Sequence, residues 1–343
     1  MLNPKGTIKL KIEGREVKTM QGRFAYGIDL FASLWNAEIA WFPGKDSALD
    51  KSTARGSFAD SELSLGGELV GTGCLYTREN IITANGITKQ LEFYSKTADL
   101  VDSCLFPALS EIRDSDLKQI AEKVLADNDI PVKFIDPPGA PFEVIERQGV
   151  ETVAKYFQRL AAQRGLFIST DPTGTLIFQK AIQSGKPVAH LEWGGKTATE
   201  YRAKFDDRTR YAKYIAGSQA GDGEPIYATA YDPKVPKVRQ LLFDANEADA
   251  GNIQDAAEWR MLKLALEAYS IPFPVSDWYD DSGHLWKPNT IVTAKSPVLD
   301  IPDTKQFIIR QAEFAWSATG CSAVLSLVPP LTVDGSGNLK VGM

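Results

Sequence analysis

The chain has 343 residues, of which 43% are hydrophobic and 24% are charged, and its formal net charge is −6. These values are ordinary for a globular protein, and the length predicts two or three domains. No apolar run approaches the roughly 20 residues of a membrane-spanning helix, and the N-terminus lacks the apolar core of a secretory signal. We therefore expect folding in a cytoplasm and no membrane insertion. Tight binding of nucleic acid is also not expected, because it relies on Lys and Arg clusters that this acidic chain lacks.

Residues 1–108 predict a first small β-barrel. Ile8, Leu10 and Ile12 alternate with polar residues, which is the period of a half-buried strand. Glycines between Leu63 and Leu75 interrupt an apolar strand pattern and indicate bulges or barrel corners. Further short strands are expected at 80–85 and 90–94.

Residues 109–196 predict an α+β domain. Asp114-Ser115 can cap a helix whose apolar face carries Leu117, Ile120, Ala121, Val124 and Leu125. A second amphipathic helix is expected from Val150 to Ala161, ending at Gly165. The turn residues 171–174 then predict a β-hairpin between 166–169 and 175–178.

Residues 197–234 and 286–343 predict a second β region, and 235–285 an insert with a helix over 256–269. The expected strands of this part lie at 211–218, 226–230, 291–294, 307–316 and 322–328. The predicted fold class is therefore mixed and mainly β, with an α+β domain and a helical insert. The sequence contains no repeat of fixed period.

Residues that usually carry chemistry do not form a recognisable site. His190 and His284 lie outside any metal-binding or catalytic motif, and structural roles are expected for both. The three cysteines, Cys74, Cys104 and Cys321, match neither a disulfide framework nor a zinc pattern, and we expect small buried hydrophobic side chains. We predict no catalytic, cofactor-binding or metal-binding residue, and no cofactor.

Three other patterns favour structural roles as well. The acidic pairs Asp206-Asp207 and Asp280-Asp281 would point to opposite faces of a strand, so loop or edge charges are expected. The glycine pairs around Thr72 and Ser336 precede no amphipathic helix, which a phosphate-binding loop requires. Tryptophans can line a carbohydrate surface, but they more often anchor cores or interfaces; the candidates are Trp41, Trp193, Trp278, Trp286 and Trp316.

The segment Tyr94–Cys104 carries a more specific signal. It reads Tyr-Ser-Lys-Thr-Ala-Asp-Leu-Val-Asp-Ser-Cys and closely resembles a stretch at the end of the first β region of Mu-type phage baseplate hub proteins. The resemblance continues in order over most of residues 60–330, at 166–179, 207–219, 258–260, 278–289 and 325–330, and more weakly at 231–239. The helix over 256–269 is less basic than in that family.

The resemblance implies a structural protein rather than an enzyme. Hubs of this type, which are related to the hub part of type VI secretion spike proteins, are homotrimers in which each chain supplies two similar barrels. The resemblance therefore implies two similar small β-barrels in this chain, one from residues 1–108 and one from residues 197–234 and 286–343. The resulting pseudo-six-fold ring would join the six-fold tail tube to the three-fold central spike. The implied partners are the spike, the tail tube or a tube-initiator protein, and baseplate wedge proteins, while DNA passes through the lumen without specific binding. The implied location is the virion baseplate, assembled in the cytoplasm of the host bacterium. Apolar and aromatic barrel-edge residues are expected at the subunit interface.

Other interpretations of the sequence remain open. The tryptophans also fit a carbohydrate-binding or receptor-binding β-module of the tail tip. A peptidoglycan hydrolase is less favoured, because no separate catalytic domain is recognisable. The hub could also serve a bacteriocin-like tail or another injection system instead of a phage.

Overall fold

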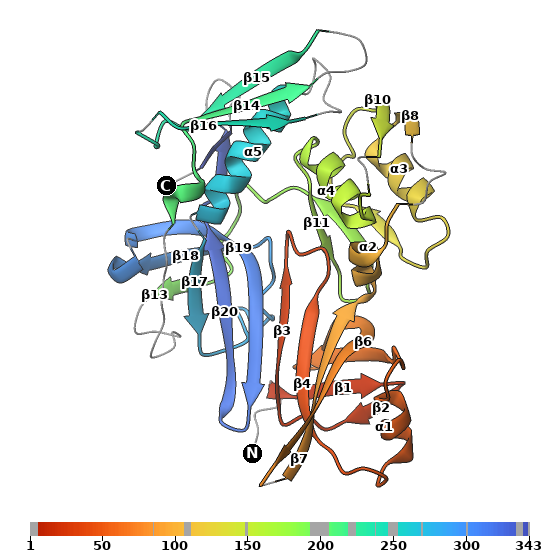
Figure 1. The fold of residues 1–343 in the computed structure, drawn as a ribbon. Helices are drawn as coiled ribbons and strands as arrows, with labels where there is room; N and C mark the ends of the chain where they lie inside the picture. Colours follow the sequence, from red (N-terminus) through yellow and green to blue (C-terminus); the bar gives the residue numbers. More distant parts are fainter. Residues whose placement is uncertain are drawn as a thin grey trace.

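The structure is a computed structural model that describes residues 6–84, 86–105, 111–147, 150–192, 206–218, 224–236, 238–245, 253–268, 270–299, 301–333 and 339–341. One large sheet forms the body, and two smaller parts with helices lie at its upper end (Figure 1). The predicted fold class, mainly β with helical inserts, is confirmed. Within the described ranges, no helix is long and apolar enough to cross a membrane.

The large sheet combines strands from both ends of the chain. Its hydrogen-bonded path is β13-β18-β19-β3-β4-β7-β6-β5-β1-β2, and β20 pairs with both β19 and β17. The strands are β1 (Ile8–Ile12), β2 (Arg15–Val17), β3 (Gln21–Gly27), β4 (Leu34–Ala40), β5 (Asp60–Leu65), β6 (Glu68–Thr83), β7 (Gly86–Ser95), β13 (His190–Glu192), β17 (Ile271–Val275), β18 (Ile291–Ser296), β19 (Ile301–Ser317) and β20 (Gly320–Val328). The short helix α1 (Ser47–Ser52) lies between β4 and β5.

β3 joins the N-terminal and C-terminal strands. It pairs with β4 on one side and with β19 on the other, both antiparallel. The same core cluster contains Phe24, Trp35 and Phe93 from the first hundred residues and Trp286 and Phe314 from the last hundred. The two regions of the chain therefore bury their apolar faces together.

Among its described residues, the α+β part contains one two-stranded sheet, one three-stranded sheet and three helices. Its elements are α2 (Asp99–Asp102), β8 (Glu111–Ser115), α3 (Leu117–Val124), β9 (Val132–Phe134), β10 (Phe142–Glu146), α4 (Val153–Ala162), β11 (Phe167–Thr170) and β12 (Leu176–Gln179). The predicted hairpin is confirmed as the antiparallel pair of β11 and β12.

Two predicted details of this part were wrong. The cap of α3 is Asp116, which forms a reciprocal capping box with Gln119, because Asp114 and Ser115 belong to β8. Val150 does not face the core: it precedes the cap residue Thr152 of α4 and is 84% exposed.

A third part lies at the top of the molecule in Figure 1. The strands β14 (Lys213–Ser218), β15 (Ile226–Tyr231) and β16 (Gln240–Asp244) form a separate sheet, and α5 (Ile253–Ala268) packs against β14 and β15. Residues 211–230 were expected to share a barrel with the C-terminal strands. The described residues of this range instead form a sheet with β16, because this sheet offers α5 an apolar face against which it can bury its own apolar side chains.

β13, expected in the α+β domain, instead pairs with β18. The domain boundaries themselves remain a prediction. β21 (Leu331–Val333) and β22 (Leu339–Val341) form a small pair after β20.

The large sheet contains the same four-strand unit twice, which we call the first unit (β4 to β7) and the second unit (β17 to β20). In both, a long hairpin has a bulge in its first strand, then seven residue pairs, then a two-residue turn. The turns end at Gly86 and Gly320, whose φ values are 149° and 144°. A backbone hydrogen bond of 2.9 Å also recurs just before each bulge. The N–H of Leu75 donates to the carbonyl of Ala59 in the first unit, and the N–H of Ile309 donates to the carbonyl of Thr290 in the second. The backbone register is therefore repeated as well as the strand order.

The second unit differs from the first in one strand. In the first unit, β3 covers the side of β4 that faces away from β7. The equivalent strand β17 carries Pro272 and Pro274 at the positions that correspond to Asn36 and Glu38. No described strand pairs with β17 on this side.

Candidate assembly surfaces

The two histidines lie apart on the surface, His190 on β13 and His284 in the turn that follows Asp280. His190 is exposed, with Nδ1 2.9 Å from the hydroxyl of Thr293, and His284 lies 3.9 Å from a carboxylate oxygen of Asp280. Among the residues that the structure describes, no group of three or more His, Cys, Asp or Glu side chains could hold a metal ion.

The acidic pairs stabilise local backbone. Asp206 accepts a hydrogen bond from the N–H of Arg208 at the start of a short 3-10 turn, and Asp207 pairs with Arg210 at 3.1 Å. Asp280 is nearly buried and accepts hydrogen bonds from two backbone N–H groups of the turn that follows it. Carboxylates used in this way are turn and ion-pair partners.

The cysteines are not the buried side chains that were expected. Cys104 is exposed, Cys74 and Cys321 are half-buried, and all three thiols are free. Cys74 lies on β6 between Asp60 of β5 and Tyr94 of β7, with its sulfur 3.5 Å from a carboxylate oxygen of Asp60. Partial burial, followed by the effect of Asp60, raises the pKa of Cys74 to about 11.

The described tryptophans mostly fill the core. Trp35, Trp278 and Trp286 are fully buried and Trp316 is 4% exposed, whereas Trp193 lies outside the described residues. The indole of Trp278 donates to two backbone carbonyls inside the sheet. The tryptophan count therefore supports neither a carbohydrate surface nor an aromatic subunit interface.

The glycines around Thr72 allow close packing between strands. A Cβ at Gly73 would overlap the backbone of Tyr94 on β7, and one at Gly71 would lie 3.0 Å from the ring of Trp35. The pair Gly335–Gly337 lies outside the described residues. Gly71 and Gly73 are thus explained by the sheet itself.

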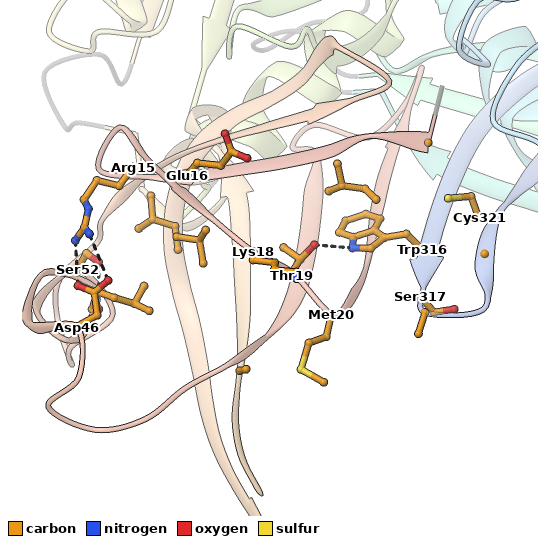
Figure 2. A pocket seen from close by; sticks show the side chains of 18 residues that line it. Arg15, Glu16, Lys18, Thr19, Met20, Asp46, Ser52, Trp316, Ser317 and Cys321 are labelled. Atoms are coloured by element: carbon orange, nitrogen blue, oxygen red, sulfur yellow. Dashed lines mark hydrogen bonds and ion pairs between the residues drawn. The ribbon is translucent and has the colours of Figure 1, made fainter. Parts of the chain in front are cut away.

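A pocket of about 720 Å³ lies between the N-terminal strands and the β19–β20 turn (Figure 2). Apolar side chains of β1, β2 and α1 line one side, and Trp316 and Cys321 line the other. Met20, which is 51% exposed, lies at its rim, and the ion pair of Arg15 with Asp46 lies at one end (Figure 2). The pocket is apolar with a charged margin, which is a common composition for a contact surface.

The outer face of the sheet formed by β14, β15 and β16 is a second apolar surface. Tyr227, Tyr231 and Leu242 are 64%, 65% and 65% exposed, while α5 covers the opposite face. Gly217 lies opposite Tyr227 in register, and a Cβ there would come within 3.1 Å of the ring of Tyr227 and 3.9 Å of the side chain of Leu242. Strand alternation in the sequence could have revealed this face, because Tyr227 and Tyr231 of β15 alternate with the small residues Ala228 and Ala230.

A third surface is the free edge of the β6–β7 hairpin. β5 covers β6 only as far as Cys74, and Ile82 near the tip is 77% exposed. Two short strands were expected at 80–85 and 90–94, whereas the structure has one continuous hairpin. Gly86, whose φ of 149° lies in the region that favours glycine, was a sequence signal for a turn here and was overlooked.

Comparison with known proteins gives consistent matches. Residues 97–180 match the family model described as baseplate hub protein gp44-like, second domain. The baseplate hub protein gp44 of Escherichia phage Mu is 24% identical over 332 residues, which cover 92% of this chain and 82% of the Mu protein. The chain is a homologue of the Mu baseplate hub protein.

Solved structures of tail proteins share the fold of this hub homologue. The 43 kDa tail protein of prophage MuSo2 from Shewanella oneidensis has a TM-score of 0.80 at 23% identity and covers 94% of this chain and 98% of its own. A tail protein from Neisseria meningitidis MC58 has a TM-score of 0.78 at 18% identity, covering 93% and 95%. A component of the Escherichia coli type VI secretion system has a TM-score of 0.57 at 14% identity, covering 94% and 76%. The resemblance inferred from the sequence is confirmed, and the relatives support the expectation of a structural protein rather than an enzyme.

Proposed function

We propose that the chain is a structural subunit of a phage baseplate hub and a component of the virion. The observation that carries this proposal is the alignment with the Mu hub protein over 92% of the chain, together with the shared fold of two tail proteins, one of them from a prophage. The protein acts through its contact surfaces, and assembly takes place in the cytoplasm of the host bacterium.

The hub is a homotrimer whose six β units form a pseudo-six-fold ring. The internal repeat supports this arrangement, because three chains with two equivalent units each supply six similar positions around one axis. Such a ring meets a six-fold tube on one side and a three-fold spike on the other. Its partners are the tail tube or a tube-initiator protein, the central spike and the baseplate wedge.

DNA passes through the lumen of this ring without sequence-specific binding. The net charge of −6 supports this role, since phosphate contacts need an excess of Lys and Arg.

The mass of the particle in solution tests the trimer. Light scattering on the purified chain, alone and mixed with the spike protein encoded beside it, is expected to give three times 37.6 kDa or a complex with three copies of each chain. Class averages of negatively stained particles should then show six lobes. A monodisperse monomer in both samples would refute the ring.

A further inference from the structure

The second half of β6 offers an unpaired strand edge. β7 pairs with one side of β6 from Gly73 to Thr83, but on the other side β5 ends opposite Cys74. No described strand pairs with this side between Thr77 and Thr83. A hairpin arm of only two strands is marginally stable in water, so a long arm of this kind is usually covered by another strand.

The backbone groups on this edge can be assigned from the turn. In a hairpin with a two-residue loop, the closing pair, here Thr83 and Gly86, exchanges hydrogen bonds. Because N–H and C=O groups alternate in direction along a strand, those of Arg78, Asn80 and Ile82 face away from β7. The edge thus presents alternating donors and acceptors with the spacing of a sheet ladder.

The second unit shows what such an edge binds. By the repeated bulge and turn, Thr77 to Ile82 of β6 correspond to Gln311 to Trp316 of β19. The same side of β19 pairs antiparallel with β3, from Gln311 opposite Gly27 to Trp316 opposite Gly22. The equivalent edge in the same molecule is therefore occupied by a strand.

The exposure of the side chains on the two strands differs in the same way as the pairing of their backbones. Trp316 is 4% exposed beneath β3, whereas Ile82 at the equivalent position is 77% exposed. Ile82 lies directly across from Ile87, so the arm carries an apolar cross-strand pair near its tip. Covering this pair would remove apolar surface from water at the same time as it completes the ladder.

We propose that the edge of β6 from Thr77 to Ile82 is the docking site for an antiparallel strand of a second copy of this chain. The occupant at the equivalent edge of β19 is β3, which also pairs with β4 of the first unit. The neighbour of the first unit on its open side lies in another copy. This contact is heterologous, since an edge of one copy meets a different segment of the next, and such contacts close into a ring when the rotation between copies closes. The inference rests on the proposed trimer and names the strand edge through which its copies join.

A proline substitution tests the backbone contact. Asn80→Pro removes the N–H at the centre of the edge and places a ring toward the incoming strand, whereas Asn80→Ala removes the same side chain and keeps the N–H. We expect the wild-type protein and Asn80→Ala to be trimers by light scattering. Asn80→Pro should need a protein concentration on the order of 100-fold higher to assemble, with an unchanged circular dichroism spectrum. An Asn80→Pro trimer at the wild-type concentration would overturn the proposal.

Hydrogen exchange on the wild-type protein gives a second measurement that does not depend on the variant folding. In the trimer, the amides of Arg78, Asn80 and Ile82 should exchange slowly, and they should exchange rapidly after dilution to the monomer. Rapid exchange in the trimer would overturn the strand contact while leaving the trimer intact, and protection that appears only after the spike is added would overturn the choice of a second copy. A wild-type monomer under all conditions would instead refute the proposed function itself.

Discussion

Ile82 and Trp316 occupy equivalent positions in the two long hairpins, but the first is 77% exposed and the second 4%. Trp316 is covered because β3 pairs with its strand and places Gly22 directly opposite it. Its indole also donates a hydrogen bond to Thr19. The contact between β3 and β19 is thus the point where the two units of the chain are joined, and its packing can be tested.

Gly22 is needed for this contact. A Cβ at this position would overlap the ring of Trp316 and the carbonyl oxygen of Asn36. Gly22→Ala should therefore lower the free energy of unfolding by about 2 kcal/mol, as overpacking of a tight core does. Urea denaturation measures the change. Gly185→Ala is the matched control, because its new Cβ would make only ordinary contacts, and equal effects of the two substitutions would contradict this account.

The stability of the fold should fall when the carboxylate of the buried ion pair between Arg210 and Asp232 is removed. The two groups are 2.8 Å apart, and their side chains are 6% and 8% exposed. Asp232→Ala leaves the guanidinium with the exposed Asp207 as an acidic partner, so we expect a loss of about 3 kcal/mol in unfolding free energy. Glu62→Ala, which removes the exposed partner of Lys11, should cost less than about 1 kcal/mol. Chemical denaturation of both variants would show whether this order holds.

The loop after β4 should make stability depend on acid pH. Asp50 accepts hydrogen bonds from the indole of Trp41 and the N–H of Gly44, and these bonds, with the nearby charge of Lys89, hold its pKa below the ordinary 3.8. A lowered pKa in the folded state means that the stabilisation is present above pH 3.8 and is lost as the pH falls through the folded value. Asp50→Asn should therefore be less stable than wild type at pH 7, and the difference should shrink below pH 3.8.

The control for this prediction is Trp41→Phe, which keeps a ring but removes the indole donor. It should reduce the acid dependence in part. Denaturation curves recorded at several pH values measure both variants, and a difference that is independent of pH would contradict the assignment to Asp50.

The three thiols should react at different rates. Cys104 is exposed, whereas burial raises the pKa values of Cys74 and Cys321, which lowers their thiolate fractions near neutral pH. A thiol reagent at pH 8 should label one group rapidly and two slowly. Cys104→Ser should abolish the rapid phase, and Cys321→Ser should leave it unchanged. A rapid phase that survives Cys104→Ser would show that the exposure of the thiols is not as described.

Local patterns in the sequence predicted much of the fold. The turn residues 171–174 specify the β11–β12 hairpin, and apolar spacing specifies the buried faces of α3 and α4. The exposure of Val150 was not predictable from spacing, because the cap at Thr152 decides where the helix begins. The separate sheet of β14, β15 and β16 was also missed, since strand signals do not specify which strands pair.

The resemblance to hub proteins implied two similar barrels, but the register of the internal repeat was not recognisable from the sequence, for a related reason. What recurs is the position of a bulge, the length of a hairpin and a turn glycine, and few side chains are shared apart from buried pairs such as Leu91 and Leu325. The open edge of β6 follows from this geometry and from the place where β5 ends. Backbone register is a tertiary property, and it became visible only when the two units could be compared strand by strand.

The prolines of β17 restrict how copies of this chain can aggregate. Glu38, the counterpart of Pro274, directs its carbonyl toward β3 and accepts the N–H of Met20, so the two prolines occupy positions that face the uncovered side of their strand. Proline has no N–H to offer there, and a foreign strand cannot complete a ladder along β17. A further receptive edge at β17 would let copies add outside a closed ring, as they do in a fibril. With one edge blunted, hydrogen-bonded growth through β17 is barred, which favours a particle of finite size even at the high concentrations reached inside an infected cell.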